Sequence, residues 1–251
     1  MSRKFNIIKN YYDEDVDLYK KKAITINEGI TVLVGCNGIG KTTLLRQMKY
    51  ELKKKNIPCI SFDNLHDGGQ NSISKAGFHA DYGFMATALQ SSEGENIIMN
   101  LGKLAARLGD FVREGNGDDE DNKRTNDFAD AMKKAYAMLN DETLETSENT
   151  NETDKDNDVE KDGNDERWIL LDAIDSGLSV DNIVDVKEDL FATILEYNYG
   201  KKIYIVVSAN EYEMARNEQC FDVYNGKYVT FKDYEEYRTT VLSSRLNKEK
   251  R

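Results

Sequence analysis

The chain of 251 residues has no long hydrophobic run, few cysteines and few histidines. No apolar stretch approaches the roughly 18 residues of a membrane-spanning helix, and the start, MSRKFNIIKNYYDEDVD, lacks the apolar core of a signal peptide. Cys36, Cys59 and Cys220 stand at unrelated positions and match neither a disulfide framework nor a metal-binding pattern. His66 and His79 have no Cys or His partner at ligand spacing. These absences predict a cytoplasmic protein with no membrane insertion.

The negative charge is concentrated in one segment. The formal net charge is −12, and Asp141–Glu166 contains twelve acidic and two basic residues, so the rest of the chain is nearly neutral. The acidic average argues against nonspecific DNA binding, although the clusters Lys20–Lys22, Lys53–Lys55 and Lys248–Arg251 leave nucleic acid open as a partner. Solvated surface is the commoner explanation of such clusters. The acidic segment is read first as a solvated linker, with mimicry of nucleic acid or tethering of a basic partner as alternatives.

The strongest pattern is VLVGCNGIGKTTLLRQM, in which Gly35–Thr42 spells G-x-x-x-x-G-K-T between an apolar strand and an amphipathic helix. The glycines permit backbone angles closed to other residues, so successive N–H groups can converge on phosphate oxygens at the helix N-terminus. Lys41 would reach the β- and γ-phosphates, and the Thr42 hydroxyl would join the shell of a Mg²⁺ ion. A glycine-rich turn without ligand is the alternative. The predicted nucleotide-contacting residues are Gly35, Asn37, Gly38, Gly40, Lys41, Thr42 and Thr43.

Strands and helices alternate along most of the chain. Short strands are predicted in KFNIIKN and KAITIN, and buried strands in Ile57–Asp63, in the segment ending WILLD and in Lys201–Ala209. Helices are predicted from Lys41, over Glu93–Val112 and around Val184–Tyr197, followed by a C-terminal β/helix segment. This order predicts an α/β fold with a doubly wound, mostly parallel sheet and a small N-terminal antiparallel part.

The acidic segment divides this pattern. Asn140–Asp165 is almost free of apolar residues, so burial cannot offset its ordering entropy and we expect disorder there. We therefore expect a single ATP-binding domain in two halves, residues 1–113 and 167–251, separated by an insertion over residues 114–166.

Asp172 ends the apolar run WILLD. A buried strand can deliver a carboxylate rigidly to a phosphate site, so Asp172 is predicted to hold Mg²⁺ together with Thr42. Taken alone, an aspartate at a strand end is more often a turn former or a helix cap. The glycine-rich motif upstream favours the metal role.

Four segments together resemble a known family. GCNGIGKTTLL, SSEGE (residues 91–95), ILLDAIDSGLS and IVVSANEYE occur in the order of the ABC-type P-loop ATPases, and the chain is most similar to the branch of SMC-like, RecF-like and stand-alone AAA-type proteins. The resemblance implies two subunits that face each other head to tail around ATP. It implies that Ser92 and Gly94 contact the γ-phosphate across that interface, that Gln70 senses Mg²⁺ and water, and that Ser176–Ser179 touch the second site. SSEGE is also an ordinary capping box, and both readings are compatible.

Aromatic residues and one cysteine near the motif have weaker assignments. Tyr11, Tyr12 and Tyr19 are candidates for stacking on adenine, although aromatics near strands are usually core residues. Trp168 is predicted to be a packing anchor. Cys36, inside the glycine-rich loop, is a candidate site of inhibition by thiol reagents.

Two positions depart from the family in ways that predict slow turnover. The general base, a glutamate directly after the Mg²⁺ aspartate in the family, is Ala173 here, which can neither accept a proton nor orient water. The switch histidine of the family is Asn210. Asp175, two residues after Ala173, is a candidate replacement for the missing base. The resulting hypothesis is an ATP-gated clamp that stays closed for long periods.

The spacing of the motifs limits the partners. Only Asn71–Gln90 separate the Gln70 loop from the SSEGE segment, too few residues for a long coiled coil or a transporter-docking subdomain. The predicted function is a nucleotide-gated switch that dimerises on Mg·ATP, as a homodimer or a heteromer, and acts on a protein effector in DNA processing or antiviral defence. An ATP-binding transporter subunit and a small-molecule kinase are the alternatives.

Overall fold

A computed structural model of the chain describes residues 2–9, 17–64, 93–115 and 165–250, with the backbone alone for 93–98, and the isolated positions 83, 86, 87 and 90. Its centre is a six-stranded sheet of order β4-β5-β6-β3-β7-β8. All neighbouring strands are parallel except the antiparallel pair β7–β8. The strands are β3 (Gly29–Val34), β4 (Cys59–Asp63), β5 (Glu166–Asp172), β6 (Lys202–Ser208), β7 (Gln219–Asp222) and β8 (Lys227–Val229).

A separate antiparallel pair lies at the N-terminus, formed by β1 (Ser2–Asn6) and β2 (Ala23–Asn27). The mostly parallel α/β sheet and the small antiparallel part predicted from the sequence are therefore confirmed. Strands from both sides of the acidic insertion belong to one sheet, because β4 pairs with β5 and β3 pairs with β6. Residues 116–164 of the insertion, as well as His66 and His79, lie outside the described residues.

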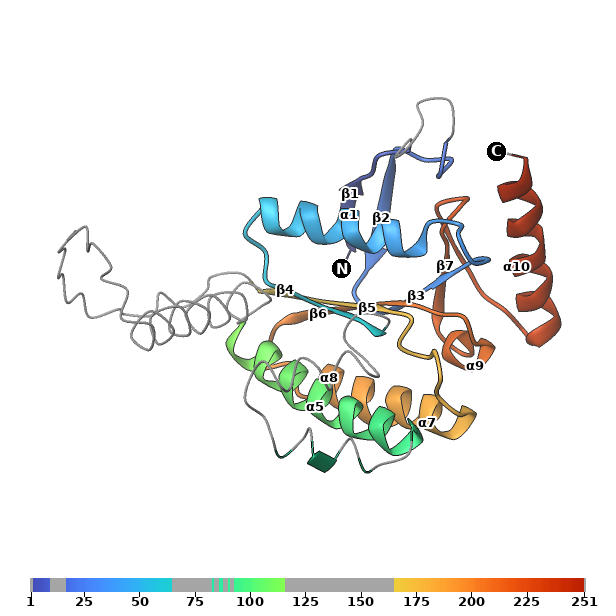
Figure 1. The fold of residues 1–251 in the computed structure, drawn as a ribbon. Coiled ribbons are helices and arrows are strands. Elements are labelled where there is room, and N and C mark those ends of the chain that lie inside the picture. Colours follow the sequence, from blue (N-terminus) through green and yellow to red (C-terminus); the bar gives the residue numbers. More distant parts are fainter. Residues whose placement is uncertain are drawn as a thin grey trace, which may run out of the picture.

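Helices cover both faces of the sheet (Figure 1). Helix α1 (Lys41–Lys54) lies on one face together with β1 and β2, and α5 (Glu93–Glu114) lies on the other. The second face also carries a continuous helical segment in which a π-helical stretch, η1, joins two α-helices. Its parts are α7 (Val180–Asp185), η1 (Val186–Phe191) and α8 (Ala192–Glu196). This helical segment begins four residues before the predicted start at Val184.

Two further helices follow β6. The short helix α9 (Tyr212–Ala215) connects β6 to β7, and α10 (Tyr234–Glu249) ends the described chain. Asp233 caps α10, because its carboxylate accepts a hydrogen bond from the N–H of Glu236. No helix within the described ranges is long and apolar enough to cross a membrane.

The central strands are hydrophobic because both of their faces are covered. Burial of β5 and β6 alternates between two apolar cores, one under α5 and α7–α8 and the other under α1 and β1–β2. Trp168 lies in the second core, fully buried, with its ring stacked on Tyr204 at 4.0 Å and edge-on to Phe5 at 5.0 Å. The packing role predicted for Trp168 is confirmed.

Candidate functional site

The turn from β3 into α1 is a glycine-rich loop, residues 35–40. Gly35, Gly38 and Gly40 have φ angles of 142°, 76° and 111°, in the region that side chains disfavour. A Cβ atom on Gly35 would lie 3.0 Å from Ile39 Cγ2, and one on Gly40 would lie 3.0 Å from the Tyr19 hydroxyl oxygen. The loop therefore requires glycine for its backbone angles and for its close packing.

Tyr19 supports this loop from within the core. Its side chain is 1% exposed, and its hydroxyl donates a hydrogen bond to the Gly40 carbonyl oxygen at 2.8 Å. A ring in this position is not open to stack on a base, so the adenine-stacking hypothesis for Tyr19 is wrong. The residue is fixed by burial because it fills the space between the N-terminal sheet and α1. Tyr11 and Tyr12 lie outside the described residues.

Lys41, the first residue of α1, folds back across the loop. Its side chain is buried, and Nζ donates a hydrogen bond to the Gly35 carbonyl oxygen at 2.8 Å. Burial lowers the pKa of Lys41, while the nearby carboxylates of Asp175 and Asp172 act in the opposite direction. A buried ammonium with one neutral acceptor is poorly solvated, so an anion placed in the loop would interact with it favourably.

Hydrogen bonds of Ser208 connect the carboxyl end of β5 to the end of β6. The Ser208 hydroxyl donates to Asp172 Oδ1 and accepts the N–H of Ala173 at 2.9 Å. Ser208 is buried, and Ala173 has a left-handed φ of 52°. Sequence reasoning overlooked Ser208, although a hydroxyl at the end of a strand of otherwise buried apolar residues is a recognisable signal. The pairing of Leu171 with Val207 sets the register that brings Asp172 and Ser208 together.

Asp175 connects the loop after β5 to the loop after β6. Its carboxylate is 1% exposed, and Oδ2 accepts the N–H groups of Asn210 at 2.6 Å and Glu211 at 2.7 Å. Oδ1 has no hydrogen-bond partner among the described residues. Burial raises the pKa of Asp175, and the two backbone hydrogen bonds partly oppose that rise. Its assignment as a replacement base stays a prediction, and Oδ1 is the oxygen left to accept a proton.

Asp175→Asn is expected to raise stability at neutral pH, and the gain should shrink as the pH falls. Because burial raises the folded pKa of Asp175, the folded state binds more protons than the unfolded chain between the two pKa values, so the wild type loses stability as the pH rises through this window. Each unit of difference between the folded and the unfolded pKa changes the free energy of unfolding by about 1.4 kcal/mol. Urea unfolding of both proteins between pH 4.5 and 8 measures the effect. A wild type that gains stability relative to the variant as the pH rises would contradict it.

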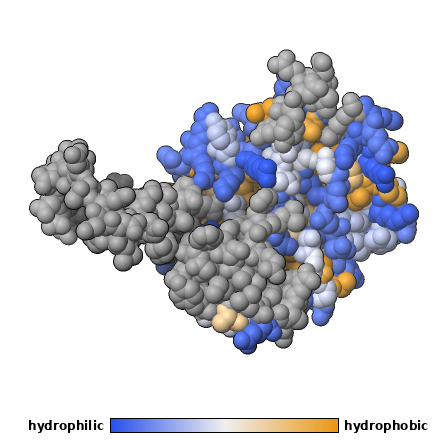
Figure 2. Space-filling model, in the orientation of Figure 1, coloured by the Kyte–Doolittle hydropathy of each residue, from blue (hydrophilic) through white to orange (hydrophobic). Residues whose placement is uncertain are grey.

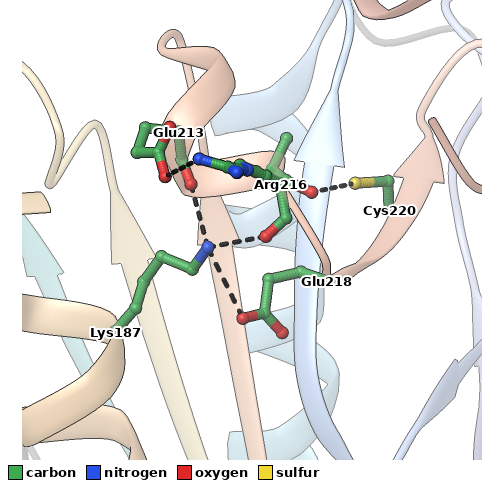
Figure 3. Close-up of polar contacts among 6 residues, drawn as sticks. Lys187, Glu213, Arg216, Glu218 and Cys220 are labelled. Atoms are coloured by element: carbon green, nitrogen blue, oxygen red, sulfur yellow. Dashed lines mark hydrogen bonds and ion pairs between the residues drawn. The ribbon is translucent and has the colours of Figure 1, made fainter. Parts of the chain in front are cut away.

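Lys187 connects η1 with the segment around α9, farther from the glycine-rich loop (Figure 3). Lys187 Nζ, from η1, donates to the carbonyl oxygens of Glu213 at 2.9 Å and Arg216 at 2.6 Å, and pairs with Glu218 at 3.7 Å. The Cys220 thiol donates to the Ala215 carbonyl at 3.3 Å, and burial raises the pKa of this thiol to about 12. Lys187 thereby neutralises the carbonyl end of α9, the helix that follows Asn210 and Glu211.

Helix α10 lies against the first half of the glycine-rich loop. The N–H of Cys36 donates to Ser244 Oγ at 2.7 Å, and Lys248 Nζ donates to the Asn37 carbonyl oxygen at 3.1 Å. A cavity of about 530 Å³ lies between the loop and the helix. Its lining includes Asn37 and Asn210, together with Tyr237, Arg245 and Lys248 of α10. The sequence did not indicate that the last helix would contact this loop.

The structure describes some of the remaining predicted site residues and not others. Thr42 and Thr43 are half-buried in the first turn of α1, and Gly94 is in the first turn of α5. The N-terminal end of α5 points toward the same end of the sheet as the glycine-rich loop (Figure 1). Ser176 and Ser179 are exposed in the loop that precedes α7. Gln70 and Ser92 lie outside the described residues.

A larger groove, of about 790 Å³, lies between α5 and the η1–α8 segment. Its lining includes Leu101, Ala105, Leu190 and Ile194 and contains none of the site residues predicted from the sequence. The candidate site is therefore the loop with its neighbours at the carboxyl ends of β3, β5 and β6, where ligands bind in open α/β sheets.

Neither the family models nor the curated proteins nor the solved structures include a match to this chain. Function is therefore inferred from the geometry of the chain itself.

Proposed function

We propose that the chain binds Mg·ATP at the glycine-rich loop, and that bound ATP joins two copies into a slowly hydrolysing, nucleotide-gated switch. The observation that carries the proposal is the loop itself, with three glycines at positive φ between β3 and α1 and the buried Lys41 ammonium across it. Backbone N–H groups and the positive end of a 14-residue helix face an anion at such a position. A phosphate oxygen would replace the Gly35 carbonyl as the acceptor from Lys41.

The donor set around the loop fits a Mg²⁺ ion held jointly by protein and nucleotide. Thr42 offers a hydroxyl, and Asp172 offers a carboxylate held in place by Ser208. No group of three or more His, Cys, Asp or Glu residues that could hold a metal ion by itself occurs in the described ranges. Mg²⁺ commonly uses one or two protein oxygens and completes its shell with phosphates and water, so this sparse set suits Mg·ATP.

The slow hydrolysis of ATP in this proposal is based on the residues near Asp172. Ala173 has no side chain that could accept a proton, and the Asp175 carboxylate already accepts two backbone hydrogen bonds. Ser176 and Ser179 are exposed, so the loop Ser176–Ser179 could contact a second copy, or a partner subunit that brings its own base. A closed dimer of long lifetime would then act on a protein effector, in DNA processing or antiviral defence.

Light scattering combined with a phosphate-release assay tests the proposal. The protein is measured without nucleotide, with Mg·ATP and with Mg·ADP, and released phosphate is followed in the same samples. We expect a dimer with Mg·ATP only, persisting while little phosphate is released. A monomer under all three conditions, or rapid phosphate release without dimerisation, would overturn the switch and direct attention to a partner subunit.

A further inference from the structure

We infer that α10 completes the nucleotide site of its own chain, with Lys248 as an additional ligand of the phosphates. The inference rests on the proposed binding of ATP at the glycine-rich loop, and it adds a residue that lies more than 200 positions farther along the chain. It also assigns a role to the cavity between α10 and the loop.

The position of Lys248 against the loop is close and specific. Its Nζ lies 3.1 Å from the Asn37 carbonyl oxygen. A Cβ atom on Gly38 would lie only 2.6 Å from the same nitrogen, so the ammonium rests directly on the glycine backbone. Gly38 adopts a φ of 76°, and the Lys248 ammonium lies over it.

Polar and aromatic contacts hold α10 at this distance from the loop. Ser244 is buried and accepts the N–H of Cys36. Two turns earlier, the Tyr237 hydroxyl donates to the Asn210 carbonyl oxygen at 3.1 Å, and its ring packs on Phe231 and Tyr212 with centroids 5.4 and 5.5 Å away. Lys248 is thus carried by a helix that is fixed to both the loop and the segment after β6.

The charge balance of the proposed site favours a cation in addition to Lys41. ATP carries roughly four negative charges, of which Mg²⁺ neutralises two, and the phosphates would lie near Asp172 and Asp175. Arg245 also lines the cavity, but its Nε is paired with Glu249 at 3.1 Å. Lys248 forms no ion pair with a carboxylate of the described residues, and its side chain is exposed, so its charge is available to a phosphate.

Helix α10 also exposes apolar side chains. Figure 2 shows hydrophobic residues among hydrophilic ones where α10 lies, and Leu242, which lines the cavity, and Leu246 are 45% and 58% exposed. Toward its C-terminal end the helix makes hydrogen bonds to the loop through Ser244 and Lys248. A ligand that adds ionic contacts there would fasten this end further.

Titration of Mg·ATP and Mg·ADP into Lys248→Ala, Lys248→Arg and Lys250→Ala tests the inference. Lys250 is exposed at the same end of α10 and does not line the cavity, so it controls for general charge. We expect Lys248→Ala to bind Mg·ATP about tenfold more weakly, Lys248→Arg to retain most of the affinity, and Lys250→Ala to match the wild type. Unchanged thermal melting would show that the loss is local.

Other outcomes separate this inference from the proposed function. If wild-type protein binds Mg·ATP and Lys248→Ala binds it equally well, the phosphate role of Lys248 is wrong while ATP binding stands. If Lys248→Ala binds more tightly, α10 competes with the nucleotide and the inference is overturned. If the wild type binds neither nucleotide, both proposals fail.

Discussion

We expect Lys41→Ala to lower the proposed affinity for Mg·ATP by about 100-fold or more and to leave the chain folded. In the wild type this ammonium is buried across the glycine-rich loop, where its one hydrogen bond within the described residues goes to the neutral Gly35 carbonyl. Charge-assisted hydrogen bonds to the β- and γ-phosphates contribute about 1.5–3 kcal/mol each, and alanine removes them. Removing the lysine also removes a buried charge whose pKa is lowered by burial, so no large loss of folding stability is expected.

Isothermal titration with Mg·ATP, together with thermal melting, measures this effect. Lys54→Ala is the matched control, since Lys54 is an exposed lysine in the last turn of the same helix and lies far from the loop. The control should bind as the wild type does. Retained affinity in Lys41→Ala would show that the glycine-rich loop is not where the nucleotide phosphates bind.

We expect Ala173→Glu to raise the rate of phosphate release by about 100-fold and to shorten the lifetime of the proposed ATP-bound dimer. General base catalysis typically contributes 100- to 10,000-fold, and position 173 directly follows Asp172 at the carboxyl end of β5. The new side chain meets no additional backbone penalty, because residue 173 already has a φ of 52° with alanine. Residue 173 is half-buried, so a longer side chain can extend toward solvent.

Ala173→Gln is the control that separates proton acceptance from the size of the new side chain. Glutamine fills the same space but does not accept a proton at neutral pH, so this variant should release phosphate as slowly as the wild type. Single-turnover phosphate release and the decay of the dimer in light scattering give the two readouts. Equal rates in Ala173→Glu and Ala173→Gln would place the cause of slow turnover elsewhere, and loss of residual release in Asp175→Asn would then identify Asp175 as the working base.

Local patterns along the chain predicted the central strands and the main helices of the fold, while the C-terminal part was predicted only as a β/helix segment. Apolar runs of strand length predicted the strands that became β4, β5 and β6, and the pattern of G-x-x-x-x-G-K-T between a strand and a helix predicted the glycine-rich loop. These predictions succeed because backbone freedom at glycine and the burial of short apolar strands are determined by neighbouring residues. The start of the segment α7–α8 was missed by four residues, because an exposed first turn carries little hydrophobic signal.

The sequence by itself therefore determined the parts of the candidate site that are continuous in the chain, from Gly35 to Thr43 and from Asp172 to Asp175. Tertiary structure decided which distant groups meet them. The order of the sheet places Ser208 beside Asp172, and the return of the last helix places Ser244 and Lys248 on the loop. Tyr19 likewise became a support for Gly40 through its burial. Contacts of this kind depend on strand order and helix packing, and no spacing along the chain encodes them.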